Sequence, residues 1–266
     1  MDILQTIILS LVEGITEFLP VSSTGHMILA SYVMKISDQA FVKTFEIAIQ
    51  LGAIAAIVML YYKRFIQGID IYIKLFIAFL PTAAVGFLAY KTIKTYLFNP
   101  LGVSLALVVG GVILILIDKW VVSRESRYVE LEDISYKNAF FIGLAQCVSM
   151  IPGVSRAAAT IIGGVANGLN KKQATEFSFL LAVPTMCAAT GYDLLKTDAT
   201  LSSREFLLLA IGFAGAFVSA WLAVKVFIRF VENHGFKAFG YYRIFIGIVF
   251  LVYMALSGSA SLFNPF

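Results

Sequence analysis

Two acidic residues near the N-terminus lie inside an otherwise apolar stretch. Glu13 and Glu17 are four residues apart, so a helix would place both carboxylates on one face. Two like charges so close are unfavourable unless one of them holds a proton or a cation lies between them. Carboxylate oxygens are the ligands that hard divalent cations prefer. We therefore predict that Glu13 and Glu17 bind a divalent metal ion. The alternative is an amphipathic surface helix with two solvated acids.

A group of hydroxyls with one histidine follows directly, at Ser22, Ser23, Thr24 and His26. If 22–24 caps a helix, His26 lies three residues beyond Ser23 and on the same face. A hydroxyl and an imidazole so placed suit a nucleophile and its base, or a proton donor to a leaving group. The other interpretation is a helix cap without a catalytic function, and both stay open at this point.

Arg156 is the one basic residue between Lys137 and Lys171 in the sequence, and it begins an apolar run. A buried charge needs an anionic partner, and a guanidinium matches phosphate oxygens bidentately. A helix N-terminus at this point would favour the same anion, and the hydroxyls of Ser155 and Thr160 would add donors. We predict a phosphate site at Arg156. The alternative is that Arg156 pairs with one of the two carboxylates described above.

Membrane helices must position these residues, because the composition excludes a soluble domain. Of the 266 residues, 60% are apolar and 14% are charged, against about 45–50% and about 25% in soluble domains. The mean hydropathy is +0.89. The net charge of +4 does not indicate nucleic-acid binding. The basic residues lie at the ends of apolar segments, where anionic lipid headgroups and membrane orientation require them.

Six apolar windows are long enough to cross a bilayer whose hydrocarbon core is about 30 Å thick. They are 43–62, 71–90, 101–122, 177–192, 206–230 and 239–254. We therefore expect an all-α polytopic membrane protein with about six spanning helices, built as a single integral membrane domain over residues 1–266.

Four shorter apolar segments form two pairs, each interrupted at a proline. The segments 3–12 and 27–34 flank Pro20, and the segments 138–148 and 157–166 flank Pro152. Irregular backbone at membrane depth persists only where protein or a water-filled cavity surrounds it. We therefore expect two re-entrant helix-loop-helix hairpins that face a shared cavity.

The two halves of the chain repeat one another. Pro152 and Ser155 follow Pro20 and Ser23 at an offset of 132 residues, which predicts a first repeat over about 1–118 and a second over about 136–256. If loops 63–74, 119–137, 171–172 and 225–237 face the cytoplasm, that side carries 12 Lys and Arg and the opposite side carries 6. With three helices between the hairpins, this orientation makes the repeats inverted.

The run from Glu13 to His26, together with Pro-Gly-Val-Ser-Arg at 152–156, strongly resembles the undecaprenyl-diphosphate phosphatase family associated with bacitracin resistance. The likeness covers essentially the whole chain. Glu13 and Glu17 match the acidic motif of that family. Three further sets of residues match its other motifs: the hydroxyls at 22–24, His26, and the Ser-Arg pair at 155–156. Ala157 stands where the family commonly has Ser, so any role for a hydroxyl there is absent.

The resemblance implies an enzyme of the bacterial inner membrane whose active site opens toward the periplasm and needs Mg²⁺ or Ca²⁺. It implies hydrolysis of a polyprenyl diphosphate lipid, undecaprenyl diphosphate, to undecaprenyl phosphate and inorganic phosphate, which recycles the lipid carrier for cell-wall synthesis. Membrane lipids would be its other partners, and a homodimer stays open.

The position of Ser23 at the expected helix start, on the face shared with His26, suggests roles for the residues singled out above. Ser23 is the candidate nucleophile and His26 its base, while Glu13, Glu17 and Arg156 stabilise the transferring charge. Further phosphate contacts would come from Ser22, Thr24, Ser155 and Thr160. In the competing mechanism water attacks directly, and Ser23 only donates a hydrogen bond to the phosphate.

Two other functions share parts of this pattern. The lipid phosphatases of the phosphatidic acid phosphatase type also have Ser-Gly-His and Ser-Arg motifs. They place a catalytic His shortly after the Arg, where this chain has Ile162, and that function is therefore not expected. A secondary transporter or a lipid-phosphate flippase built on the same inverted repeat is the remaining alternative.

Overall fold

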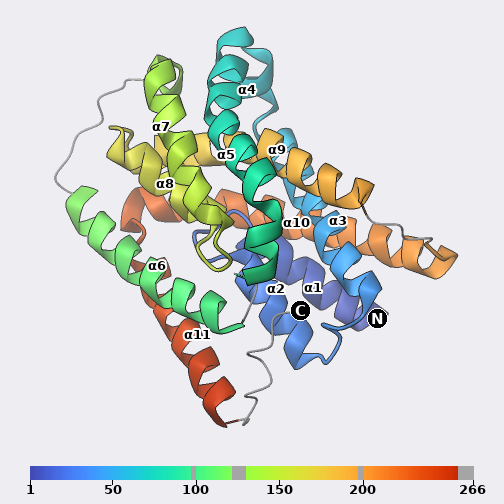
Figure 1. The fold of residues 1–266 in the computed structure, drawn as a ribbon. Coiled ribbons are helices and arrows are strands. Elements are labelled where there is room, and N and C mark those ends of the chain that lie inside the picture. The colour runs from blue at the N-terminus through green and yellow to red at the C-terminus, as the bar shows by residue number, and fades with distance from the viewer. Residues whose placement is uncertain (97–99, 122–129, 197–200, 257–266) are drawn as a thin grey trace.

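The computed structural model describes residues 1–96, 100–121, 130–196 and 201–256, and every regular element in these ranges is a helix (Figure 1). Of the loop at 119–137, residues 122–129 lie outside the described residues. The helices are α1 (Ile3–Thr16), α2 (Ser23–Val33), α3 (Ala40–Leu60), α4 (Tyr62–Ile66), α5 (Ile69–Tyr96), α6 (Pro100–Val121), α7 (Tyr136–Cys147), α8 (Arg156–Ala166), α9 (Lys171–Leu195), α10 (Ser203–His234) and α11 (Lys237–Leu256), with 3-10 turns η1 (Leu131–Asp133) and η2 (Val148–Met150).

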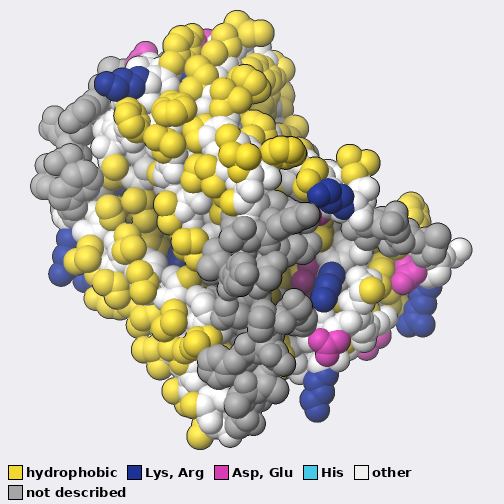
Figure 2. All heavy atoms as spheres, viewed as in Figure 1, with side chains coloured by type: hydrophobic (Ala, Val, Ile, Leu, Met, Phe, Trp, Pro, Cys, Tyr) yellow, Lys and Arg dark blue, Asp and Glu magenta, His cyan; other side chains and the backbone are white. Residues whose placement is uncertain are grey.

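Within the described ranges, six helices are long and apolar enough to cross a membrane, which confirms the predicted number of spanning segments. They are α3, α5, α6, α9, α10 and α11. Large apolar side chains face outward, as Phe87 and Leu88 of α5 do with 76% and 83% exposure. Figure 2 shows such side chains spread over much of the visible face, with charged side chains gathered toward its margins. The chain is a multi-pass membrane protein of the all-helical class.

The predicted breaks at Pro20 and Pro152 separate α1 from α2 and α7 from α8. In each turn a serine, Ser22 or Ser155, caps the second helix by accepting a hydrogen bond from a backbone N–H in its first turn. The φ angles of these caps are 74° and 77°, a conformation that costs about 1–3 kcal/mol and persists where the surroundings enforce it. The caps pair Ser22 with Ser155, whereas the sequence offset paired Ser23 with Ser155, because the second turn has one more residue between proline and cap.

Close helix packing holds the two helix-turn-helix units in place. Helix α1 packs along α10, and α7 packs along α5. Gly14 and Gly143 allow this packing, since a Cβ on Gly14 would lie 2.5 Å from the carbonyl oxygen of Ala216, and one on Gly143 would lie 2.1 Å from that of Ala78. Small residues that let two backbones approach are typical of membrane helix interfaces. Helix α8 contacts both α7 and α9, and α6 pairs with α11 (Figure 1).

Aromatic packing anchors the first turn in the interior. Phe18 is fully buried and meets the ring of Phe179 on α9 edge to face, with ring centroids 5.5 Å apart. Phe179 in turn contacts Phe227 of α10. Because Phe18 directly follows Glu17, this packing holds the end of α1 beside α9.

Candidate active site

The two turns line a common pocket of about 120 Å³. Its lining residues are Glu17, Ser22, Ser23, Thr24, Gln50, Ser149, Pro152, Gly153, Ser155, Arg156 and Met186. Six residues singled out from the sequence are in this set, whereas Glu13, His26 and Thr160 are not. The fold therefore brings candidate residues from both halves of the chain to one cavity.

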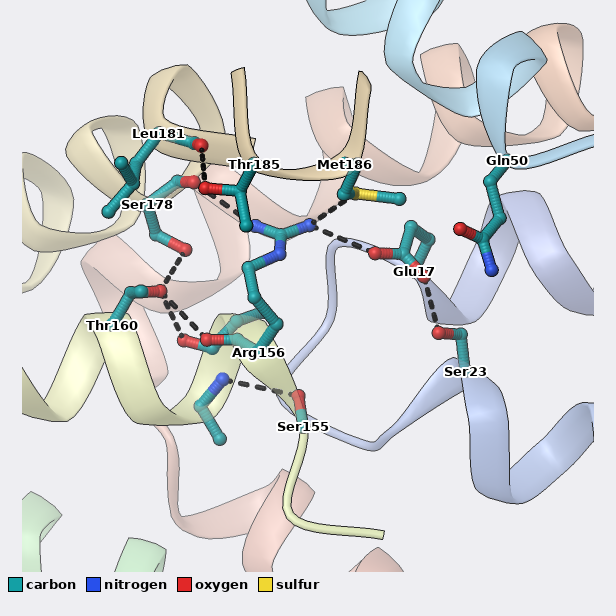
Figure 3. A network of polar contacts seen from close by, with 12 residues as sticks. Glu17, Ser23, Gln50, Ser155, Arg156, Thr160, Ser178, Leu181, Thr185 and Met186 are labelled. Carbon is teal, nitrogen blue, oxygen red and sulfur yellow. Dashed lines mark hydrogen bonds and ion pairs between the residues drawn. The ribbon is translucent and has the colours of Figure 1, made fainter. Parts of the chain in front are cut away.

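Arg156 is the first residue of α8, and its side chain extends toward Glu17 at the end of α1 and toward Ser178 and Met186 on α9 (Figure 3). Its Nη2 donates to Oε1 of Glu17 at 3.0 Å, and its Nη1 donates to the backbone carbonyl of Ser178 at 3.1 Å. The guanidinium carbon lies 5.4 Å from the centre of the Phe18 ring. Its Nε is buried and has no hydrogen-bond partner among the described residues. Arg156 thus pairs with a carboxylate, while its Nε is the nitrogen that makes no hydrogen bond to the described residues.

The hydroxyl of Ser23 donates a hydrogen bond to Oε2 of Glu17. One carboxylate therefore holds Ser23 with one oxygen and Arg156 with the other (Figure 3). This arrangement differs from the expected pairing of Ser23 with His26, because Glu17 occupies the position from which a base would accept the Ser23 proton.

His26 lies one turn further along α2, outside the pocket lining. Its Nδ1 is 2.8 Å from the carbonyl oxygen of Ser22, and its Nε2 is 2.8 Å from the hydroxyl of Tyr242, on which the ring stacks. Since a carbonyl only accepts, Nδ1 carries the proton and Nε2 accepts from Tyr242. The bond back to the Ser22 carbonyl directs the imidazole along the helix, so neither ring nitrogen is available to Ser23.

Glu13 is buried in α1, with 1% exposure, one turn before Glu17. Its Oε1 has no hydrogen-bond partner in the described part of the chain. An orphaned carboxylate oxygen next to a second acidic residue suits a hard cation. Over the same residues, no group of three or more His, Cys, Asp and Glu side chains is placed to hold a metal. Glu13 offers a cation this free oxygen, whereas both Glu17 oxygens already accept from Ser23 and Arg156. The pair therefore fits a cation only if Glu17 shares its oxygens and if water and substrate phosphate supply the other ligands, as is usual for Mg²⁺.

The remaining predicted hydroxyls divide between the pocket and its support. Ser22 and Ser155 line the pocket as the caps described above, and Thr24 lines it as an exposed residue. Thr160 is fully buried outside the lining; it contacts the hydroxyl of Ser178 at 2.6 Å and donates to the carbonyl of Arg156 at 2.9 Å. It lies one turn into α8 and is not among the residues that line the pocket, so its predicted phosphate contact stays a prediction.

Several residues near this centre were not among the predicted site residues. Gln50 of α3, Ser149 of η2 and Met186 of α9 line the pocket, and Thr190 donates to Oε1 of Gln50 at 3.3 Å. This bond leaves the amide NH₂ of Gln50 as a donor. Arg243 of α11 is fully buried beneath both turns. The sequence could have indicated Arg243, because it is a charged residue inside the apolar window 239–254 and such residues mark functional positions in membrane proteins.

Comparisons with known proteins agree on one family. The sequence profile described as "Bacitracin resistance protein BacA" matches residues 6–249. A protein named undecaprenyl-diphosphatase from Wolinella succinogenes is 50% identical over 256 residues, covering 96% of this chain and 100% of the relative. Proteins of the same name from Bdellovibrio bacteriovorus and Aquifex aeolicus are 50% and 47% identical, covering 95% and 94% of this chain and 96% and 97% of their own lengths.

Proposed function

The chain belongs to the bacitracin resistance protein BacA family, and we propose that it is a membrane phosphatase that hydrolyses undecaprenyl diphosphate to undecaprenyl phosphate and inorganic phosphate. The observation that carries the proposal is the pocket in which Glu17 holds Ser23 and Arg156 at once. A hydroxyl, an acceptor for its proton and a guanidinium are the groups that phosphoryl transfer to serine requires.

In the first step, Ser23 Oγ bonds to the terminal phosphorus. The bond from that phosphorus to the bridging oxygen breaks, and undecaprenyl phosphate leaves with the electron pair. The Ser23 proton passes to the carboxylate of Glu17, which already accepts its hydrogen bond. Arg156 offers its unused Nε–H to the transferring oxygens and offsets their charge.

In the second step, water attacks the phosphorus of phosphoserine, and the P–Oγ bond breaks. Glu17 returns to Oγ the proton that it took from Ser23, and both protons of the water leave on the phosphate, which is released as dihydrogen phosphate. The N-terminus of α2 lies at Ser23, so backbone N–H groups favour the anion in both steps.

A divalent cation, Mg²⁺ or Ca²⁺, is part of the proposal. Glu13 and Glu17 would hold it, and when bound it would offset the negative charge that a diphosphate brings next to two carboxylates. The unpartnered Oε1 of Glu13 is the observation that supports it.

We also propose that the two helix-turn-helix units are re-entrant and that the halves form an inverted repeat. The packing supports this, because the first helix of each unit packs on a spanning helix of the other half: α1 on α10, and α7 on α5. The pairing of α6 with α11 joins the last helix of each half. With the bias of Lys and Arg counted above, the proposal orients the protein in the bacterial inner membrane with its pocket toward the periplasm.

The test is release of inorganic phosphate from undecaprenyl diphosphate by the purified chain in detergent. Hydrolysis without a membrane separates an enzyme from a transporter or flippase. Ser23→Ala should lower the rate by several orders of magnitude if Ser23 is the nucleophile, and by about 10²–10³-fold if it only donates a hydrogen bond. A phosphoserine trapped at position 23 would establish the covalent route.

The matched control is Ser10→Ala. Ser10 is also a buried serine, and its hydroxyl bonds to a carbonyl of its own helix α1. Full activity in Ser23→Ala would contradict both mechanisms, and no phosphate release from the wild type would contradict the proposed function.

A further inference from the structure

Arg243 is fully buried in the second turn of α11, and the described residues give it no ion pair. Its guanidinium donates five hydrogen bonds, all to backbone carbonyls. The acceptors are the carbonyl of Pro20 at 3.1 Å, of Gly153 at 2.8 Å, of Val154 at 2.9 Å, of Ala106 at 3.1 Å and of Leu107 at 3.4 Å. A guanidinium has five N–H donors, so every donor of this side chain is used.

These acceptors belong to three separate segments. Pro20 lies in the turn between α1 and α2, and Gly153 and Val154 lie in the turn between α7 and α8. The other two carbonyls belong to α6. One side chain from α11 therefore joins both pocket-lining turns to each other and to a spanning helix.

The bonds fall next to the strained caps of the two turns. The Val154 carbonyl is part of the peptide bond that precedes Ser155, and the Pro20 carbonyl lies two residues before Ser22. Left-handed serine persists only where neighbouring groups enforce it. Both caps line the pocket, and each directly precedes a residue of the proposed mechanism.

We propose that Arg243 is a positioning residue that clamps the two turns together and so sets the placement of Ser23 relative to Arg156. It does not touch substrate, because carbonyls occupy all of its donors. Lysine cannot replace it, since an ammonium has three donors on one nitrogen and cannot reach acceptors spread around a planar fork. The kinetic consequence rests on the proposed phosphatase function, whereas the clamp itself does not.

Two variants perturb the clamp in different ways. Arg243→Lys keeps the positive charge and removes the planar guanidinium with its five N–H donors. Gly110→Ala keeps Arg243 but adds a Cβ that would lie 2.2 Å from its Nη2, so the guanidinium must move. Gly191→Ala is the control, because a Cβ there meets nothing within 4 Å.

The experiment measures hydrolysis and hydrogen–deuterium exchange on the full chain in detergent. We expect both clamp variants to lower kcat about 10²-fold, the usual effect of misplacing reacting groups by about 1 Å, with a much smaller change in KM. Amide exchange should rise in segments 18–25 and 150–157 and stay unchanged in α10. Gly191→Ala should match the wild type in both readouts.

Unchanged amide exchange at the two turns in both variants would overturn the clamp. A rise in exchange of equal size throughout the helices would also overturn it, because that result would show a general structural role for Arg243. Faster exchange at the turns with wild-type kcat would overturn the positioning role. The exchange result stands even if the wild type does not hydrolyse the lipid, so failure of the clamp and failure of the proposed function are distinguishable. If Arg243→Lys does not fold, Gly110→Ala carries the test.

Discussion

Substitution of Arg156 by lysine tests whether the site needs a guanidinium or only a positive charge. The native side chain sends Nη2 to Glu17 at 3.0 Å and Nη1 to the Ser178 carbonyl at 3.1 Å, and its Nε has no partner among the described residues. In the proposed mechanism this Nε donates to the substrate. A lysine ammonium can satisfy one of these directions and leaves the others without a donor.

The size of the effect follows from the hydrogen bonds that a lysine cannot make. A hydrogen bond to a charged group contributes about 1.5–3 kcal/mol, and the lysine variant gives up two of the three that Arg156 directs to Glu17, to the Ser178 carbonyl and, in the proposed mechanism, to the phosphoryl group. We expect the barrier to rise by about 3–6 kcal/mol, so kcat/KM should fall about 10²–10⁴-fold.

The assay is phosphate release at several substrate concentrations, together with a thermal unfolding curve to show that the variant is folded. Arg64→Lys is the matched control, because Arg64 pairs with Glu176 at 3.6 Å and does not line the pocket. If Arg156→Lys keeps kcat/KM within about threefold of the wild type, the site needs only a positive charge. The requirement for a guanidinium with several donor directions is then refuted.

Three other outcomes are expected. Glu17→Gln should lower kcat/KM more than about tenfold, because the amide is a poor proton acceptor for Ser23; equal loss in the exposed-acid control Glu232→Gln would contradict this. A chelator should abolish phosphate release, and added Mg²⁺ or Ca²⁺ should restore it; full activity in chelator would show that no cation is needed. Gly143→Ala should destabilise the packing of α5 on α7 by about 1–3 kcal/mol, read as a lower unfolding temperature than that of Gly191→Ala; no difference between the two would contradict the close-packing argument.

The number of spanning helices and the places where two helices break could be predicted because both are local properties. A span needs only about 20 consecutive apolar residues. Pro20 and Pro152 stand beside Ser and Gly residues that favour a turn, whereas Pro81 and Pro184, in apolar surroundings, lie inside α5 and α9. The structure accordingly has six long apolar helices in its described ranges and breaks near Pro20 and Pro152. The register of the caps was missed, since the second turn is one residue longer and only the backbone shows which serine adopts a positive φ.

The types of side chain at the site could be predicted from the sequence, but not which of them bond to each other. Residues 17–26 contain a carboxylate, hydroxyls and a histidine at helical spacing, so several hydrogen bonds among them are possible. The local sequence pattern favoured a bond between Ser23 and His26. Tertiary structure reversed this, because Tyr242 from α11 takes one nitrogen of the imidazole and Arg156 holds Glu17 beside Ser23.

By itself the sequence determined that this is a helical membrane protein, which residue types are too polar to be there for packing, and which family the motifs resemble. Only the tertiary structure decided which of those residues share a pocket, since Glu17 and Arg156 are 139 residues apart, and Arg243 reaches Pro20 across 223. The physical reason is the distance along the chain over which each interaction acts. Hydropathy and helix breaking act between neighbours in the chain, whereas a buried guanidinium finds its acceptors wherever the packed backbone leaves carbonyls within about 3 Å.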